Sequence, residues 1–441
     1  MIVFILAVFA FNLALMSASP TSSFKLYPPY CSKEMLHRKI PPLQNSYDGD
    51  SIIDNNNQSG KQKLIGETRL IHVSVIIRHG ARTPWSNEIK CWNGFWNSSE
   101  TGIWNCDDIT TFMTAPSRNG TGTSSSDSAF FLFEKRYDAL KNALNGTCQM
   151  GQLLQHGYDQ QIQNGRIIRD AYTYMKGEYD HDERMRLLDI SLQDYVPWHP
   201  NKLYYRSDDD QRTVMSGQVL LRGLFDPELS LIKENSSNKK YKGDDNSNLE
   251  IVIPLHIADR ERDILDGIGK DCARLDTIKD EAKKSPAYQA FNESQESKDV
   301  RKFMENELGM DSSDASPMDC MMCTICTDRT LPAIIDDYDT TRNNWFTRLI
   351  EHEIQQYTIP MKYNNAEWSK LAFGPLWYEI MKNINPHLKD DDDDTIAAPK
   401  LALFAGHDTT LMPLLASLGP NLWNNTDWPP YASMLLIEVR S

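Results

Sequence analysis

The pattern of hydrophobic and polar positions predicts short buried strands separated by helices. Leu70–Ile77 is almost continuously apolar and rich in β-branched residues, which is typical of a parallel strand covered on both faces. Further strands are expected over Lys202–Tyr205, Leu249–Leu255 and Lys400–Phe404. The pattern therefore predicts an α/β fold, with a mainly parallel sheet flanked by helices and a smaller α-helical cap subdomain.

Helices are predicted where apolar residues recur every three to four positions. One such stripe runs over Leu154–Tyr172 and another over Phe373–Ile380. Thr409–Leu418 is expected to be a helix that ends at Gly419. The charged, helix-prone segment from Asp271 to about Asp339 is the candidate cap, packed over the mouth of the sheet.

The start of the chain is apolar and uncharged up to Met16, and small residues and Pro20 follow. This pattern predicts a signal peptide, and the alternative is an anchor helix that is not cleaved. The expected division of the chain is residues 1–19 signal peptide, 20–84 start of the α/β core, 85–150 inserted surface region, 151–270 core continued, 271–345 helical cap and 346–441 end of the core.

Charge and composition narrow the function classes. The 46 Lys and Arg residues stand against 61 Asp and Glu, and a net charge of −15 argues against nucleic-acid binding. Eight cysteines and seven N-x-Ser/Thr sequons favour a disulfide-bonded glycoprotein of the secretory pathway, secreted or in the lysosomal or endosomal lumen. Membrane association is expected only if the leader is retained or an anchor follows Ser441, and a homodimer is left open.

Charged residues follow three of the predicted strands. Arg78 and His79 come after the first, Arg206 after the second, and His407 with Asp408 after the last. Because the carboxyl ends of strands in open α/β sheets form the ligand crevice, these side chains are expected to meet at one site.

The residue types at this site are those that phosphoryl transfer needs. The segment Arg78–Pro84 (RHGARTP) places His79 between the guanidinium groups of Arg78 and Arg82, and guanidinium forks match phosphate oxygens. A neutral imidazole held there could attack phosphorus and form a phosphohistidine. Arg206 would supply a third fork to the phosphate.

The remaining oxygen and the leaving group need their own partners. His407 would donate to the last phosphate oxygen, and Asp408 would protonate the leaving alkoxide. A carboxylic acid is a good donor only in acid or when its pKa is raised, so an acidic optimum is expected. No metal or other cofactor is expected, because arginines supply the positive charge.

At these residues the chain resembles the histidine acid phosphatases of the phosphoglycerate-mutase-like superfamily. The segments that carry the resemblance are Arg78–Pro84, Tyr205–Ser216, Ile253–His256, Gly406–Thr410 and Pro429–Ser433. The resemblance implies that His79 is the nucleophile and Asp408 the proton donor. It also implies that Arg78, Arg82, Arg206 and His407 hold the phosphate, in an acid phosphatase acting on small phosphomonoesters or phosphorylated biomolecules.

Two alternatives to a general acid phosphatase stay open. One is a phytase-like, sugar-phosphate or lipid-phosphate phosphatase of the same family, although Thr409 stands where phytases tend to have Asn. The other is a non-catalytic glycoprotein on the same fold, which would be expected to have lost at least one site residue.

Four further features have two interpretations each. Cys320, Cys323 and Cys326 favour disulfides over a metal site, which needs four ligands. His256 either lines the site or is packed. The tryptophans near residues 92–104 indicate packing around a Cys91–Cys106 bridge rather than a ligand platform. Arg212 is expected in a surface ion pair rather than as support for Arg206.

Overall fold

The structure is a computed structural model that divides into two compact units. It describes residues 3–9, 30–32, 40, 69–85, 95, 103–106, 112–114, 132–134, 144, 146–174, 185–189, 202–237, 253–267, 272–311, 316–335, 344–388, 398–424 and 427–441. Unit 1 comprises Met1–Gly80, Tyr158–Glu293 and Ile354–Ser441, and unit 2 comprises Ala81–Gly157 and Ser294–Glu353.

A six-stranded sheet forms the centre of unit 1. Its strands, in spatial order, are β1 (Val3–Phe9), β10 (Met434–Arg440), β2 (Leu70–Arg78), β9 (Leu401–Gly406), β7 (Leu203–Ser207) and β8 (Leu255–His256). The neighbouring strands β2, β9, β7 and β8 run parallel to one another. At the other edge β10 runs antiparallel to β2, and β1 runs antiparallel to β10. The predicted mainly parallel sheet is therefore confirmed.

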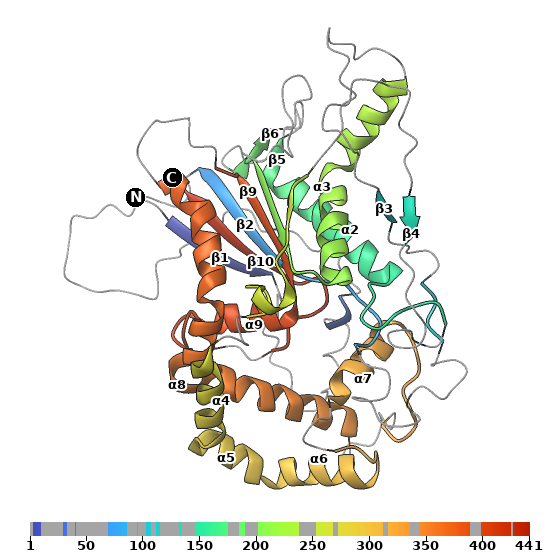
Figure 1. Ribbon diagram of the computed structural model, residues 1–441, viewed down its shortest axis with the longest axis vertical. Coiled ribbons are helices and arrows are strands. Elements are labelled where there is room, and N and C mark those ends of the chain that lie inside the picture. Colours follow the sequence, from blue (N-terminus) through green and yellow to red (C-terminus); the bar gives the residue numbers. More distant parts are fainter. Residues whose placement is uncertain are drawn as a thin grey trace, which may run out of the picture. The chain divides into compact units, whose positions relative to one another are not determined.

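Helices cover both faces of this sheet (Figure 1). On one face, Val73 and Val75 of β2 pack with α2 (Gln155–Tyr172) and α3 (Gln211–Ser237). On the other face, Ile76 packs with α9 (Asp408–Ala416), α4 (Ala273–Lys283) and the second half of α8 (Trp345–Ile384). Burial on both faces explains why β2 is apolar at nearly every position.

The predicted elements agree with the structure except for one strand. The predicted strands that lead to His79 and to His407 are present, as are the helices α2 and α9. Gly419 follows α9 with a φ of +87°. Of the strand expected over Leu249–Leu255, Ile253 and Pro254 are loop and pairing begins only at Leu255, while residues 249–252 lie outside the described residues. In the described part of this segment the strand is Leu255–His256, and its pairing with β7 brings His256 beside Arg206.

Two predicted segments lie in places that the sequence did not indicate. Val3–Phe9, inside the predicted signal peptide, pairs with β10, and the signal peptide stays a prediction. In the expected cap, α4 and α5 (Pro286–Glu293) belong to unit 1, whereas α6 (Gln295–Asn306) and α7 (Pro317–Cys326) belong to unit 2. Among the helices that the structure describes, none has the length and hydrophobicity to cross a bilayer.

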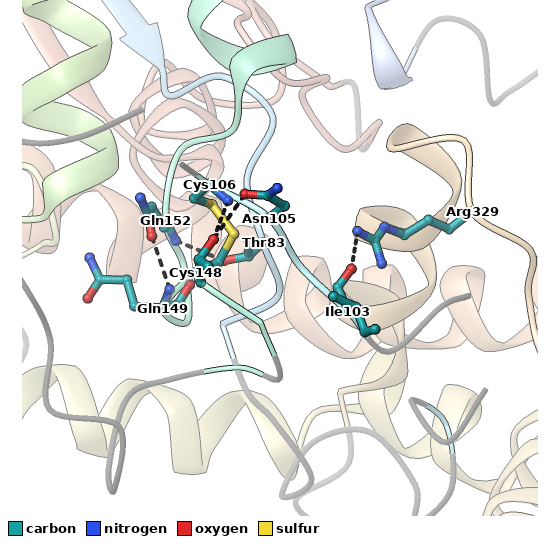
Figure 2. The surroundings of a disulfide bond; sticks show 9 residues. Thr83, Ile103, Asn105, Cys106, Cys148, Gln149, Gln152 and Arg329 are labelled. Carbon is teal, nitrogen blue, oxygen red and sulfur yellow. Dashed lines mark hydrogen bonds between the residues drawn. A yellow bond between two sulfur atoms is a disulfide. The ribbon is translucent and has the colours of Figure 1, made fainter. Parts of the chain in front are cut away.

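Unit 2 contains α6, α7 and the start of α8. It also contains a hairpin of β3 (Phe112–Thr114) and β4 (Leu132–Glu134) and a disulfide between Cys106 and Cys148 (Figure 2). The expected Cys91–Cys106 bridge was wrong. The backbone amides of Thr147 and Cys148 donate to the carbonyl of Trp104, at 2.9 and 3.2 Å, and this pairing brings Cys148 rather than Cys91 to Cys106.

The other cysteines and tryptophans largely follow the preferred interpretations. Cys320 and Cys326 are disulfide-bonded, which confirms the preference for disulfides at these two positions, whereas Cys323 keeps its thiol. Trp104 is 1% exposed, and the Arg329 guanidinium lies 3.8 Å from its ring centroid. Trp104 is therefore packed within unit 2, while Trp92 and Trp96 lie outside the described residues.

Removing the Cys106–Cys148 bridge is expected to destabilise the protein. The bridge closes a chain segment with a sequence separation of 42 residues, and releasing a loop of that size lowers the free energy of unfolding by about 4 kcal/mol. Urea denaturation of the double variant Cys106→Ser/Cys148→Ser measures this change. Cys272→Ser, at a free and partly buried cysteine, is the matched control and should unfold near the wild-type midpoint. Equal midpoints for the double variant and wild type would contradict the prediction.

Candidate active site

The backbone around His79 is anchored on three sides in unit 1. The His79 amide donates to the Gly406 carbonyl at 3.0 Å, and the Ala432 amide donates to the His79 carbonyl at 3.0 Å. The Gly80 amide donates to Ser216 Oγ at 3.2 Å. His79 is 1% exposed, so its ring leaves the end of β2 in a fixed direction.

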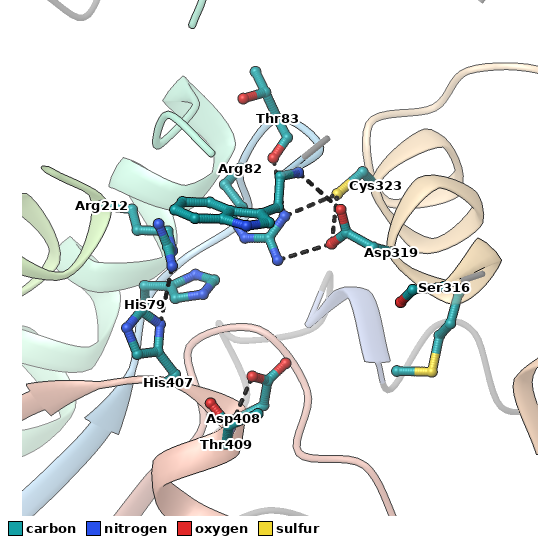
Figure 3. A network of polar contacts seen from close by, with 12 residues as sticks. His79, Arg82, Thr83, Arg212, Ser316, Asp319, Cys323, His407, Asp408 and Thr409 are labelled. Carbon is teal, nitrogen blue, oxygen red and sulfur yellow. Dashed lines mark hydrogen bonds and ion pairs between the residues drawn. The ribbon is translucent and has the colours of Figure 1, made fainter. Parts of the chain in front are cut away.

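The His79 ring is held in one tautomer. Its Nδ1 lies 2.8 Å from the Gly80 carbonyl oxygen, which can only accept a hydrogen bond. Nδ1 therefore carries the proton, and in the neutral ring the lone pair is on Nε2. The His407 ring lies edge-on, with 5.4 Å between the two ring centroids (Figure 3). Of the two ring nitrogens, Nε2 is therefore the one that can act as a nucleophile.

Arg78 is fully enclosed beside His79. Its guanidinium lies 4.2 Å from the ring centroid of Tyr431 and 5.2 Å from that of Tyr30. Nη1 donates to the Pro429 carbonyl, and Nη2 lies 2.7 Å from Asp408 Oδ2 and 3.1 Å from the Tyr30 hydroxyl. Two aromatic rings, a carbonyl and the Asp408 carboxylate thus hold the buried positive charge of Arg78.

Asp408 is the first residue of α9 and accepts three hydrogen bonds. Oδ1 accepts from the Thr409 amide at 2.8 Å, and Oδ2 accepts from Arg78 Nη2 and from Trp428 Nε1, each at 2.7 Å. Three donors suit a carboxylate rather than a carboxylic acid. In this arrangement Asp408 is held as the ionised form.

His407 is placed by the turn between β9 and α9. A Cβ at position 406 would come within 2.6 Å of Thr410 Oγ1, so only glycine fits before His407. The same Oγ1 accepts from the His407 amide at 2.9 Å. The sequence Gly406-His407-Asp408 therefore directs two adjacent side chains from one tight turn.

The His407 ring has a partner at each nitrogen. Nε2 contacts Asp208 Oδ2, and Nδ1 lies 3.3 Å from Arg212 Nη2. Because a carboxylate oxygen only accepts, Nε2 carries the proton that faces Asp208. In this structure Asp208 therefore takes the N–H of His407 that was predicted to face a phosphate oxygen.

Asp208 stays ionised in acid. Burial by itself raises its pKa, but the charge and hydrogen bond of His407, the Thr213 hydroxyl and the charge of Arg212 outweigh burial, so its pKa lies below the ordinary value. A carboxylate with a lowered pKa stabilises the folded state above its unfolded pKa, and this contribution is lost as the pH falls through the folded-state pKa. The contact with His407 therefore persists at mildly acidic pH.

Asp208, Asp210 and His407 bring ligand atoms within 4.8 Å of one another, which is a spacing that a cation could use. Arg212 already places a positive charge among them, with Nη2 2.8 Å from Asp210 Oδ2 and 3.3 Å from His407 Nδ1. The guanidinium thus contacts two of the three side chains that a metal ion would use.

Arg206 and Arg82 each contact an acidic side chain of their own unit. Arg206 is in β7, and its Nη2 lies 3.5 Å from Asp263 Oδ1. Its neighbour on β8 is His256, which is exposed and stacks on Tyr204 with 4.6 Å between ring centroids. Arg82 belongs to unit 2. The structure thus brings together Arg78, His79, His407 and Asp408 of the six predicted residues.

The predicted surface position of Arg212 was wrong, and several neighbours of the site were not predicted. Arg212 is 8% exposed and contacts His407, because the first turn of α3 packs it inward instead of leaving it on the surface. Asp208 and Trp428 were not singled out, although Asp208 stands two residues after Arg206 in a segment that was. No periodicity or motif signalled Trp428.

A family profile and several curated proteins match this chain. The sequence profile described as "Histidine phosphatase superfamily (branch 2)" matches residues 69–441. Counting factor 60 of Dictyostelium discoideum is 23% identical over 84% of this chain and 76% of its own length. Lysosomal acid phosphatase of Homo sapiens is 26% identical over 66% of this chain, and the match spans 59% of that protein.

Solved structures were also found that are similar to this chain, at low identity. The multiple inositol polyphosphate phosphatase of Bifidobacterium longum in complex with inositol hexasulfate has a TM-score of 0.48 at 11% identity, covering 88% of this chain and 85% of that one. A phytase of Klebsiella sp. has a TM-score of 0.45 at 16% identity, covering 84% and 78%.

Proposed function

The chain belongs to branch 2 of the histidine phosphatase superfamily, and we propose that it hydrolyses phosphate monoesters by passing the phosphoryl group through His79. The observation that carries this proposal is the hydrogen bond from His79 Nδ1 to the Gly80 carbonyl, which leaves the lone pair on Nε2. The buried charge of Arg78 and the carboxylate of Asp408 lie 2.7 Å apart beside it.

In the first step the Nε2 lone pair of His79 attacks phosphorus as the bond from phosphorus to the leaving oxygen breaks. The leaving oxygen takes a proton from Asp408, so that an alcohol rather than an alkoxide departs. In the second step Asp408 accepts a proton from water, which attacks phosphorus and releases His79 and inorganic phosphate. Together the two steps return the enzyme to its starting state, in which Asp408 is protonated and His79 is free of phosphate.

Asp408 has to be protonated before the first step. In the structure it accepts from Arg78 and Trp428, an arrangement that suits the ionised form. A phosphate oxygen that takes over the Arg78 donor would remove one of these hydrogen bonds and bring negative charge near the carboxylate. Both changes favour protonation, so substrate binding itself would prepare the acid.

Binding of the phosphate is assigned to Arg78, Arg82, Arg206 and His407. Support for Arg78 is its burial next to His79. For His407 to donate to phosphate, its Nε2–H would have to exchange Asp208 for a phosphate oxygen. The roles of Arg82 and Arg206 stay predictions, which rest on the family resemblance of the segments that contain them.

The reaction is expected to need no metal and to be fastest in acid. Arginine guanidinium groups supply the positive charge on the phosphate oxygens, and protonation of Asp408 is favoured at low pH because aspartic acid has an ordinary pKa near 4. Hydrolysis of an aryl phosphate by the glycosylated protein, measured from pH 4 to 8 with and without a chelator, tests both points. The expected result is a bell-shaped profile with an acidic maximum that the chelator leaves unchanged.

Loss of activity with the chelator would contradict metal independence, and restoration by one divalent cation would identify Asp208, Asp210 and His407 as its ligands to be tested. A maximum above pH 7 would contradict the role of an aspartic acid as proton donor.

The disulfides support a place in the secretory pathway or lysosome. Cys106 and Cys148 are bonded to each other, and Cys31, Cys320 and Cys326 are also disulfide-bonded. Such bonds persist in oxidising compartments. The apolar start of the chain, the sequons and the names of the lysosomal relatives favour the same location.

A further inference from the structure

Helix α7 in unit 2 carries a carboxylate and a thiol to the side chain of Arg82 (Figure 3). Arg82 Nη2 lies 2.8 Å from Asp319 Oδ1, and Arg82 Nη1 donates to Cys323 Sγ at 3.4 Å. Nη1 also donates to the Thr83 carbonyl at 3.0 Å. Arg82 is only 8% exposed, so its guanidinium plane is held among these groups instead of moving in solvent.

Asp319 holds the loop as well as the guanidinium. Its second oxygen, Oδ2, accepts from the Trp85 amide at 2.8 Å. One carboxylate therefore binds the side chain of Arg82 and the backbone three residues later. Between these points, the Thr83 hydroxyl donates to the Gln149 carbonyl at 2.7 Å. The loop backbone and the arginine side chain are thus fixed by different partners, and Asp319 contributes to both.

The helix that carries Asp319 is itself anchored. Glu353 accepts from the Ser316 hydroxyl and, at 3.1 Å, from the Met318 amide, which satisfies donors at the start of α7. Cys320 and Cys326 of the same helix are disulfide-bonded. Asp319 is therefore a fixed group to which the Arg82 side chain is bound, and not a mobile surface acid.

We infer that Asp319 is a positioning residue, which orients the Arg82 guanidinium for the phosphate of the substrate. This inference rests on the proposed function, in which Arg82 binds phosphate. A guanidinium matches phosphate oxygens only when its plane is correctly directed. Asp319 and Cys323 engage its two Nη atoms and thereby set this plane.

Two opposite effects follow from removing the Asp319 charge. The positive charge of Arg82 is less neutralised, which favours phosphate binding, while the side chain loses its orientation, which opposes binding and catalysis. Misplacement of a positioned group by about 1 Å can lower rates by about 100-fold. The loss of orientation is therefore expected to outweigh the gain in positive charge, because the ion pair with Asp319 also holds the plane of the Arg82 guanidinium.

The test compares Asp319→Asn with wild type for kcat and KM on an aryl phosphate and for the inhibition constant of inorganic phosphate. Loss of roughly 10- to 100-fold in kcat/KM and weaker phosphate inhibition are expected. In an Arg82→Ala background the same Asp319→Asn change should alter kcat/KM less than twofold, because the group that it positions is gone. A merely structural role would lower the melting temperature and leave the phosphate inhibition constant unchanged.

Glu296→Gln is the matched control, because it removes another ion pair of unit 2, in which Arg348 Nε lies 2.5 Å from Glu296 Oε1. It should leave kcat/KM and phosphate inhibition at wild-type values. If Asp319→Asn does not fold, Asp319→Glu keeps the charge and displaces it by one methylene, and a several-fold loss is expected.

Folded Asp319→Asn or Asp319→Glu protein with wild-type phosphate inhibition would overturn the inference. A full effect of Asp319→Asn in the Arg82→Ala background would overturn it as well. Failure of the proposed function is a separate outcome, in which wild-type protein neither hydrolyses the aryl phosphate nor binds inorganic phosphate.

Discussion

Replacing His79 by alanine is expected to abolish phosphatase activity, lowering kcat by roughly 10⁴-fold or more. Removal of a covalent nucleophile has effects of this size, because the remaining groups can only assist direct attack by water. The bond from His79 Nδ1 to the Gly80 carbonyl places the lone pair of the neutral ring on Nε2, the atom proposed to attack phosphorus.

The experiment has two readouts. Steady-state hydrolysis of an aryl phosphate gives kcat, and rapid quenching in alkali, which preserves phosphohistidine, gives the amount of phosphorylated enzyme. Wild-type protein should show the phosphorylated species and the His79→Ala variant should not. Retention of more than about one per cent of kcat would contradict the role of His79 as nucleophile.

His72 offers a matched control, because it is a histidine of β2, the strand that leads to His79. It is fully buried, and its ring nitrogens lie 2.8 Å from the Pro399 carbonyl and 2.8 Å from Ser74 Oγ. Burial lowers its pKa to about 3, so it is neutral at the assay pH. His72→Ala should lower the melting temperature, because it removes a packed side chain, while each folded molecule keeps its kcat.

Replacing Asp408 by asparagine is expected to slow hydrolysis according to the leaving group. Alkyl phosphates, whose leaving alkoxides are strongly basic, should lose roughly 10²- to 10⁴-fold in kcat, because general acid catalysis contributes about that much. Aryl phosphates with acidic phenols need little protonation and should lose about tenfold or less. A plot of log kcat against leaving-group pKa should therefore be steeper for the variant.

The structure offers a competing role for Asp408, which the same experiment separates. Asp408 also pairs with Arg78 and accepts from Trp428, so its loss could disturb phosphate binding. A disturbance of binding would affect all leaving groups equally. Equal losses for alkyl and aryl phosphates would therefore exclude Asp408 as the acid, and Asp427→Asn, at an exposed neighbouring carboxylate, should change neither.

Strands and turns near the site were predictable because their signals are local. β2 and β9 are apolar enough to be covered on both faces. β2 ends in Arg78, and His407 and Asp408 come directly after β9. Parallel pairing of these strands places Arg78 opposite Gly406. The meeting of His79 and His407 follows from that register, and the sequence indicated it because strand ends are marked by a change from apolar to charged residues.

Partners of the site residues were less predictable because they come from segments distant in the chain. Arg212 was expected on the surface, as charged residues of helices commonly are, but α3 packs it against His407. Asp319 is 237 positions after Arg82, and Trp428 approaches Asp408 from the loop before β10. The contacts depend on how helices and loops pack, and no periodicity in the sequence encodes such a pairing.

The sequence by itself determined the α/β class, the family and the chemical types that the site presents, because these depend on local apolar runs and on short motifs. Only the tertiary structure decided that Cys106 bonds Cys148, that the His79 lone pair is on Nε2 and that Asp208 binds His407. Each of these is a contact between atoms. Contacts follow from the folded path of the backbone, in which residues far apart in sequence become neighbours.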